Sequence, residues 1–334
     1  MVINGGLYME ERFQVLSLDG GGIKGIFSAA VLAAIEEDLR VKVVDLFDLI
    51  VGTSTGGIIA IGLGLGLSPA QMVEFYFEMG PRIFPKYRWW KKRLRQALRP
   101  LYSPINLQKA LRDRSVLGDR LLGDSSKSLV IPSYSLSEDG VYLFKTDHHP
   151  RLRRDWKVPA WQVAMATAAA PTYFRTARQP DNLRLIDGGV WANNPAMVGV
   201  TEAAGVFKVP LEHIRVLSLG TTSPISRKSL RFDTGGCLQW MFGITDVFLR
   251  GQSLCAANQA GHLLEANNFL RLDPPVEDGV FALDGTGRSS ELIAKARFAS
   301  RELMPSIERV FGSHRAMLHV PHRSDDENCA DKEI

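Results

Sequence analysis

Short apolar runs that end at glycine-rich segments divide the first part of the chain. Residues 13–18 form one such run, which ends at Asp19 and three glycines, and residues 46–51 form another, which also ends at a glycine. Each run is followed by an apolar stretch of helical length, at 23–39 and at 58–67. Two strand–glycine loop–helix units in series predict a parallel sheet with crossover helices, and ligand chemistry at the carboxyl ends of its strands.

The same pattern continues less regularly along the rest of the chain. Further strands are predicted at 129–134, 140–145, 183–186 and 214–219, the first two as candidates for a pair. Helices are predicted at 160–170, 238–249, 253–265 and 289–311. We therefore expect an α/β core domain over 13–220, a mainly helical part packed on the same domain over 221–323, and a polar, disordered tail over 324–334.

Composition and charge place the chain among ordinary globular enzymes. Of its 334 residues, 45% are hydrophobic and 23% are charged, and the net charge of +4 is too small to indicate polymeric nucleic acid. Cys237, Cys255 and Cys329 have neither disulfide-framework nor zinc-site spacing. The first residues lack a signal-peptide pattern, and the longest apolar stretch is too short to span a bilayer. We expect a cytoplasmic protein that visits a membrane surface and needs no metal or cofactor.

A serine lies in the second glycine-rich segment. The segment is Gly-Thr-Ser-Thr-Gly-Gly at 52–57, so Ser54 stands between small residues where a strand is expected to end and a helix to begin. Glycines such as Gly52 and Gly56 permit a turn tight enough to push the hydroxyl out at the end of the strand. Because a serine in such a nucleophile elbow typically attacks a carbonyl, Ser54 predicts an acyl hydrolase.

The first glycine-rich segment supplies candidate groups for an oxyanion hole. It is Asp-Gly-Gly-Gly-Ile-Lys-Gly at 19–25. Gly20, Gly21 and Gly22 let backbone N–H groups turn toward a developing oxyanion, and the positive end of the following helix adds to them. This segment therefore predicts the oxyanion-binding part of an acyl-transfer site.

The other residues of this segment have competing interpretations. Asp19 is expected to fix the shape of the loop, although it also competes as a general base. Lys24 lies where it can meet an anionic head group or support the loop, and Gly25 completes the motif. A dinucleotide fingerprint is the weaker alternative, because an aspartate directly before the glycines is not part of it.

The residues alone leave the general base open. A triad needs one of seven histidines, none of which lies in a glycine-rich loop: His148, His149, His213, His262, His314, His319 and His322. Asp187, in contrast, directly follows an expected strand and precedes Gly188 and Gly189. A carboxylate on so tight a loop can be held against Ser54 as a general base. A Ser–Asp dyad and an α/β-hydrolase triad with a histidine such as His262 are both carried forward.

Four segments taken together resemble the patatin-like phospholipase family. They occur in the family's order within residues 13–220, and they are 19–25, 52–57, the run Ala-Met-Ala-Thr-Ala-Ala-Ala-Pro-Thr-Tyr-Phe at 164–174, and Asp-Gly-Gly-Val-Trp-Ala-Asn-Asn-Pro at 187–195. The resemblance implies a patatin-like three-layer α/β/α sandwich with a mostly parallel central sheet. It also implies a metal-free lipid acyl hydrolase of phospholipase A type, with Ser54 as nucleophile, Asp187 as base and Gly20, Gly21 and Gly22 as the oxyanion loop.

A narrower resemblance concerns regulation. The position of the first motif near the start, together with Gly-Thr-Ser-Thr-Gly-Gly at 52–57, is similar to the patatin-like effectors of bacterial anti-phage (CBASS) signalling. This resemblance implies hydrolysis of membrane glycerophospholipids to fatty acid and lysophospholipid at the inner face of the cell membrane. It further implies activation by a cyclic dinucleotide such as cGAMP. A nucleotide-responsive signalling module with latent activity is the alternative from another class, and the oligomeric state is not predicted.

Basic residues cluster in two places. Seven lie among aromatic residues at 86–99, where Trp89 and Trp90 are candidates for a lipid interface, and Arg151, Arg153 and Arg154 form a second cluster. A solvated helix face, attraction to anionic lipid and binding of a small nucleotide are the alternatives for the first cluster. Neither cluster carries a signature of polymeric nucleic-acid binding.

Some polar pairs have a structural interpretation beside a functional one. Asn193 and Asn194 are candidates for polarising a substrate, and equally for a turn before Pro195. His148 and His149 are expected to be solvated rather than metal ligands.

Overall fold

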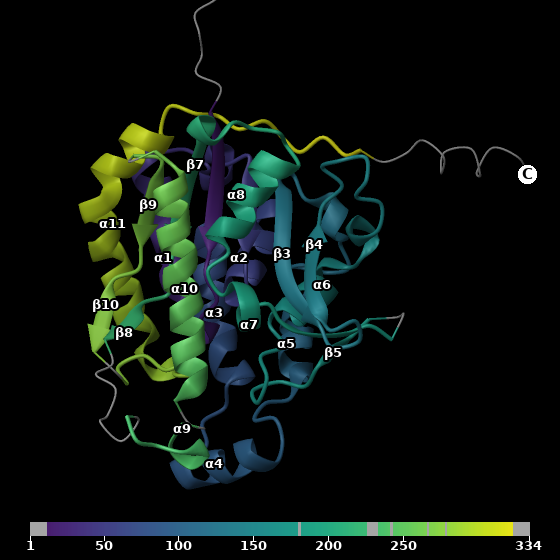
Figure 1. Ribbon diagram of the computed structural model, residues 1–334, viewed down its shortest axis with the longest axis vertical. Coiled ribbons are helices and arrows are strands. Elements are labelled where there is room, and N and C mark those ends of the chain that lie inside the picture. Colours follow the sequence, from purple (N-terminus) through teal and green to yellow (C-terminus); the bar gives the residue numbers. More distant parts are fainter. Residues whose placement is uncertain are drawn as a thin grey trace, which may run out of the picture.

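A central sheet of eight strands organises the chain in the computed structural model, which describes residues 12–179, 182–225, 233–240, 243–265, 267–277 and 279–322 (Figure 1). Its strands are β1 (Phe13–Leu18), β2 (Leu49–Gly52), β3 (Ser128–Ser135), β4 (Gly140–Lys145), β5 (Ala177–Arg178), β6 (Arg184–Asp187), β7 (Ile214–Leu219) and β9 (Phe269–Leu272). The order is β5-β6-β3-β2-β1-β7-β9, with β4 also paired to β3. Only β4 and β6 run against the direction of β3, so the prediction of a mostly parallel sheet is confirmed.

Helices cover both faces of this sheet. On one face lie α1 (Gly25–Leu39), α2 (Thr55–Gly64), α3 (Pro69–Ile83), α6 (Ala160–Thr167) and α11 (Ser289–Phe311), and on the other lie α8 (Ala196–Gly205) and α10 (Ile244–Leu263) (Figure 1). Because side chains alternate along a strand, Ile50 packs into the first helical layer while Leu49 and Val51 pack into the second. The three-layer α/β/α prediction is therefore confirmed.

The remaining helices and strands are short or peripheral. They are α4 (Trp89–Leu98), α5 (Pro104–Leu111), α7 (Gly189–Ala192), α9 (Cys237–Trp240) and the two-stranded sheet of β8 (Ser223–Ile225) and β10 (Pro275–Glu277). No helix in the described ranges is long and apolar enough to cross a lipid bilayer. The basic stretch at 86–99 contains α4, which lies at one end of the molecule (Figure 1).

Several boundaries differ from those that the sequence predicts. Leu46 ends a 3-10 turn, so β2 begins only at Leu49, because Phe47 and Asp48 first bring the chain alongside β1. The prediction of separate helices at 238–249 and 253–265 is wrong, since α10 runs without a break from 244 to 263. Residues 238–240 belong to the short α9. The boundaries of the three predicted parts stay a prediction, and the predicted tail at 324–334 lies outside the described residues.

The sequence did not predict four strands: the short β5, β8 and β10, and the longer β9. β9 joins the parallel sheet beside β7, so the chain beyond residue 220 supplies an edge strand of the central sheet as well as helices. Its sequence, Phe-Leu-Arg-Leu, is short and interrupted by a charge, which gave no clear strand pattern. That charge, Arg271, has its partner at the end of β1, as described below.

Two strands meet end to end along one edge of β3. Residues 128–130 of β3 pair with β2, and residues 133–135 pair with the antiparallel β6. β4 pairs with residues 130–135 and must therefore occupy the opposite edge. Thus β2 and β6 share an edge and run toward each other. Asp187 is the carboxyl end of β6, and Ser54 follows the carboxyl end of β2 by two residues. These two ends face each other across Ile131 and Pro132.

Candidate active site

Ser54 lies on a strained turn between β2 and α2. Its backbone has φ 55° and ψ −120°, a conformation that residues with a side chain rarely adopt. A Cβ on Gly52 would overlap the Gly56 carbonyl, and a Cβ on Gly56 would overlap the carbonyl of Leu18. The turn therefore requires both glycines for close backbone approach, as the nucleophile-elbow interpretation predicts.

The Ser54 hydroxyl donates a hydrogen bond to Asp187. The Oγ–Oδ2 distance is 2.6 Å, and the other carboxylate oxygen accepts the N–H of Gly189 at 2.7 Å. Asp187 is 6% exposed, and this burial raises the pKa of its carboxyl to about 6, against the two hydrogen bonds that favour the charged form. The arrangement pairs a partly exposed hydroxyl with a basic, ionisable partner, which is what proton abstraction needs.

Thr167, at the end of α6, links the backbone of Ser54 to that of β3 and was not singled out from the sequence. Its hydroxyl accepts the N–H of Ser54 at 2.9 Å and donates to the carbonyl of Pro132 at 2.6 Å. Two residues further on, the carbonyl of Ala169 accepts the N–H of Asp187 at 3.1 Å. The run at 164–174 thus positions the backbones of both residues, which the helix predicted at 160–170 did not indicate.

The glycine loop at 20–22 borders Ser54, with its N–H groups in different situations. The Gly20 N–H donates to the carbonyl of Asn193 at 2.9 Å, so it is already occupied. Within the described part of the chain, the N–H groups of Gly21 and Gly22 donate to no protein group. The carbonyl of Leu283 covers Gly22 so closely that a Cβ there would overlap it, and it accepts the N–H of Ile23 at 2.9 Å. Of the three predicted oxyanion donors, Gly21 and Gly22 are the available ones.

A largely buried ion cluster includes Asp19, the residue that directly precedes this loop. Arg271 of β9 donates to both carboxylate oxygens of Asp19, at 2.8 and 2.6 Å, and to Asp273 at 3.0 Å. Asp19 has no hydrogen bond to Ser54, so its structural interpretation is the one that agrees with the contacts. Lys24 is buried and donates to the carbonyl of Thr222 at 2.9 Å, which places it in support of the loop rather than at an open surface.

The helix α10 holds the segment that follows Asp187. Gln252 accepts the N–H of Asn193 at 2.7 Å, and Ser253 accepts the Asn193 side-chain amide at 3.1 Å. The side-chain oxygen of Asn194 accepts the N–H of Ala196 at 3.0 Å, which is the turn role considered for it. Both asparagines are therefore committed to shaping the loop, and α10 fixes it from outside the four motifs.

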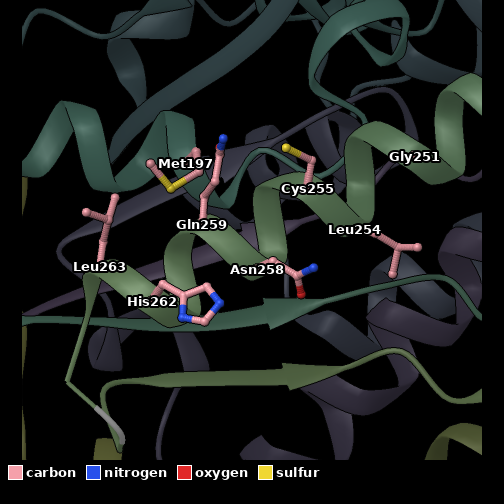
Figure 2. Close-up of a pocket in the computed structure, with 8 residues that line it drawn as sticks. All are labelled: Met197, Gly251, Leu254, Cys255, Asn258, Gln259, His262 and Leu263. Atoms are coloured by element: carbon pink, nitrogen blue, oxygen red, sulfur yellow. The ribbon is translucent and has the colours of Figure 1, made fainter.

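His262, the histidine considered for a triad, lies away from the Ser54–Asp187 pair. It lines an open groove along α10 together with Met197 and Leu254 (Figure 2). All seven histidines lie in the described ranges, and none hydrogen-bonds to Ser54 or Asp187. The same ranges hold no group of three or more His, Cys, Asp or Glu side chains placed to bind a metal ion.

The expectation that both adjacent histidines are solvated is wrong for His148. Its ring is buried, with Nε2 2.9 Å from Glu202, whose other oxygen binds Lys145 at 2.6 Å. Burial lowers the pKa of His148 against the attraction of Glu202.

In the second basic cluster, Arg154 binds its neighbour Asp155 at 3.0 Å. The side chains of Trp89 and Trp90 lie outside the described residues.

Comparison with known proteins places these features in a family context. A family model described as patatin-like phospholipase matches residues 16–200. The chain is 33% identical over 299 residues to the cGAMP-activated phospholipase of Vibrio cholerae, covering 80% of this chain and 82% of that protein. It is 30% identical over 330 residues to the cGAMP-activated phospholipase of Pseudomonas aeruginosa, covering 95% and 96%. It is 36% identical over 252 residues to that of Escherichia coli, covering 70% of each.

Asp187→Asn is expected to raise the free energy of unfolding at neutral pH. The pKa of this carboxyl is 3.8 in an unperturbed chain and about 6 in the fold, so keeping it ionised costs about 3 kcal/mol above pH 6. The neutral amide avoids that cost, so its advantage is full above pH 6, shrinks as pH falls and disappears below about pH 4. Urea unfolding across this pH range measures the effect. The exposed Asp119→Asn serves as the control, and equal stability of Asp187→Asn and the parent at neutral pH would contradict the raised pKa.

Arg271→Met is expected to destabilise the fold by about 3–5 kcal/mol, because it leaves Asp19 buried without its cation. The double variant Asp19→Asn with Arg271→Met removes the unpaired charge and should recover much of the loss. Urea unfolding of both variants tests this. If Arg271→Met unfolds at the parent's urea concentration, the cluster does not stabilise the loop.

Proposed function

The chain belongs to the patatin-like phospholipase family and is thus an enzyme that hydrolyses lipid esters, and from that premise we propose that Ser54 and Asp187 carry out the reaction. The observation that supports this assignment best is the 2.6 Å hydrogen bond from the Ser54 hydroxyl to the buried carboxylate of Asp187. We propose glycerophospholipids of a membrane as substrates, with a fatty acid and a lysophospholipid as products.

In the first step, Ser54 Oγ attacks the ester carbonyl while Asp187 Oδ2 takes the hydroxyl proton. The pKa of about 6 leaves Asp187 ionised at neutral pH and still basic enough to accept this proton. The oxyanion that forms accepts from the Gly21 and Gly22 N–H groups, which donate to no other group among the described residues. When the tetrahedral adduct collapses, the lysophospholipid alkoxide leaves with the proton from Asp187, and the acyl group stays on Ser54.

In the second step, Asp187 takes a proton from water as the water oxygen attacks the acyl-Ser54 carbonyl. Collapse of the second adduct expels Ser54 Oγ, which recovers the proton, and the fatty acid is released. The dyad thus returns to its starting state without a histidine. The positive end of α2, which begins directly after Ser54, adds favourable potential at the reacting carbonyl.

We also propose that a cyclic dinucleotide such as cGAMP activates the enzyme, in bacterial antiviral defence. The support is that three relatives named cGAMP-activated phospholipases align over 70–96% of their own lengths, beyond the four motifs. In this proposal, the nucleotide-responsive module that the sequence offered as an alternative is the hydrolase itself, and binding of the nucleotide switches on its activity.

Ser54→Ala and Asp187→Asn are each expected to lower the release of fatty acid from a fluorogenic phospholipid by at least about 1,000-fold, because each removes a group that acts in the transition state. The assay contains EDTA and cGAMP, and it uses His262→Ala as the matched control, which should stay near the parent rate. Loss of activity in His262→Ala with retention in Asp187→Asn would establish the triad instead.

Without a nucleotide, the parent enzyme is expected to release little fatty acid, and a panel of cyclic dinucleotides should identify the one that activates it. The same nucleotide should raise the melting temperature of Ser54→Ala, because a ligand that binds the folded state stabilises it by mass action. Equal release with and without every nucleotide in the panel would overturn the switch and leave the hydrolase assignment intact.

A further inference from the structure

The segment around α4 has an unusual one-sided charge. Between Glu78 and Asp113 the chain has no acidic residue and ten basic ones: Arg82, Lys86, Arg88, Lys91, Lys92, Arg93, Arg95, Arg99, Lys109 and Arg112. A surface helix that serves only as a solvated cover usually mixes both signs of charge, as α11 does with Glu291, Arg301 and Glu302. A run of one sign points to a partner of the opposite sign.

The same segment exposes apolar side chains among these cations. Leu98 at the end of α4 is 78% exposed, and Tyr87 just before the helix is 36% exposed. Lys86, Arg88 and Arg99, which flank them in sequence, are exposed as well. Cations together with exposed apolar and aromatic groups match the boundary between phosphate head groups and acyl chains. A small soluble anion would not account for the exposed leucine.

Contacts tie α4 to the loops on both sides of the catalytic pair. Lys92 binds Asp284 at 2.5 Å, and Tyr102 donates to the same carboxylate at 2.6 Å. Asp284 is next to Leu283, whose carbonyl accepts the N–H of Ile23 beside the oxyanion loop. This links α4 to one side of the site through a nearly fully buried carboxylate.

The second connection runs to the side of Asp187. Gln96 of α4 donates to the hydroxyl of Thr172 at 2.9 Å, and the N–H of Leu101 donates to the Thr172 carbonyl at 3.0 Å. Thr172 belongs to the run at 164–174, in which Ala169 accepts the N–H of Asp187. α4 lies at one end of the molecule (Figure 1), and these contacts connect it to the segments that hold Ser54 and Asp187.

We propose that α4 and its flanks, residues 86–99, form the face by which this enzyme docks on an anionic phospholipid bilayer. This inference rests on the proposed function, because it presents the Ser54 site to the lipid that the site hydrolyses. The phosphates of the bilayer attract the exposed cations, and Leu98 and Tyr87 enter the head-group boundary. The contacts of Lys92 and Gln96 keep the docked helix in register with the site.

The test measures binding without turnover. Full-length Ser54→Ala is sedimented with vesicles of phosphatidylcholine alone and of phosphatidylcholine with phosphatidylglycerol, with and without cGAMP, at low salt. We expect binding to the mixed vesicles only, and weaker binding as salt is raised. Adding Lys86→Gln, Arg88→Gln and Arg99→Gln should weaken this binding about 100-fold, because each cation near an anionic surface contributes about fivefold.

Three exposed arginines on α11 provide the matched control. Arg297→Gln, Arg301→Gln and Arg309→Gln remove the same charge from a helix that lies elsewhere on the molecule (Figure 1), and they should leave vesicle binding almost unchanged. Thermal unfolding checks that both triple variants are folded. Equal losses in the two triple variants, no loss in the α4 variant, or no binding of Ser54→Ala to mixed vesicles would each overturn the proposal. Because Ser54→Ala does no chemistry, these outcomes are independent of the hydrolase assay.

Discussion

The Ser54–Asp187 contact depends on β3 carrying two strands along one edge. β2 and β6 approach from opposite directions and stop on either side of Ile131 and Pro132, so their carboxyl ends meet. The gap between them would leave backbone groups of β3 without a strand partner. Thr167 binds the Pro132 carbonyl, and a proline has no N–H to satisfy, so the gap is filled at little cost. A Cβ on Gly188 would overlap that same carbonyl, which explains the glycine that follows Asp187.

The segments around Ser54 contain two buried carboxylates, Asp187 and Asp19. Among the described residues, the buried Asp187 accepts two hydrogen bonds and has no cation within salt-bridge distance, whereas Asp19, equally buried, is held by the fork of Arg271. The contrast separates their roles. Burial raises the pKa of both carboxyls to about 6, so basicity alone does not separate them. Asp187 accepts the hydroxyl of Ser54, whereas both carboxylate oxygens of Asp19 accept from Arg271.

The sequence predicted the parts whose cause is local. Strand 13–18, the glycine elbow at Ser54 and the tight loop at Asp187 each follow from a few neighbouring residues, and the order of four motifs indicated the family. The sequence did not predict β9, the support from Thr167, or the occupation of the Gly20 N–H by Asn193, because each depends on a partner far away in the chain. Backbone donors look alike in a sequence, and only the fold decides which of them are already used.

The residues beyond the four motifs complete the site rather than merely cover it. Arg271 pairs with the aspartate that precedes the glycine loop at 20–22, Leu283 covers the loop itself, and Gln252 and Ser253 fix the segment after Asp187. The match to the family model ends at residue 200, so these supports lie outside it. An enzyme built in this way can change how its site is held, through the C-terminal third or α4, without any change in the dyad. That separation would give the activating ligand or the membrane surface that we propose a physical route to the glycine loop at 20–22, which we propose binds the oxyanion.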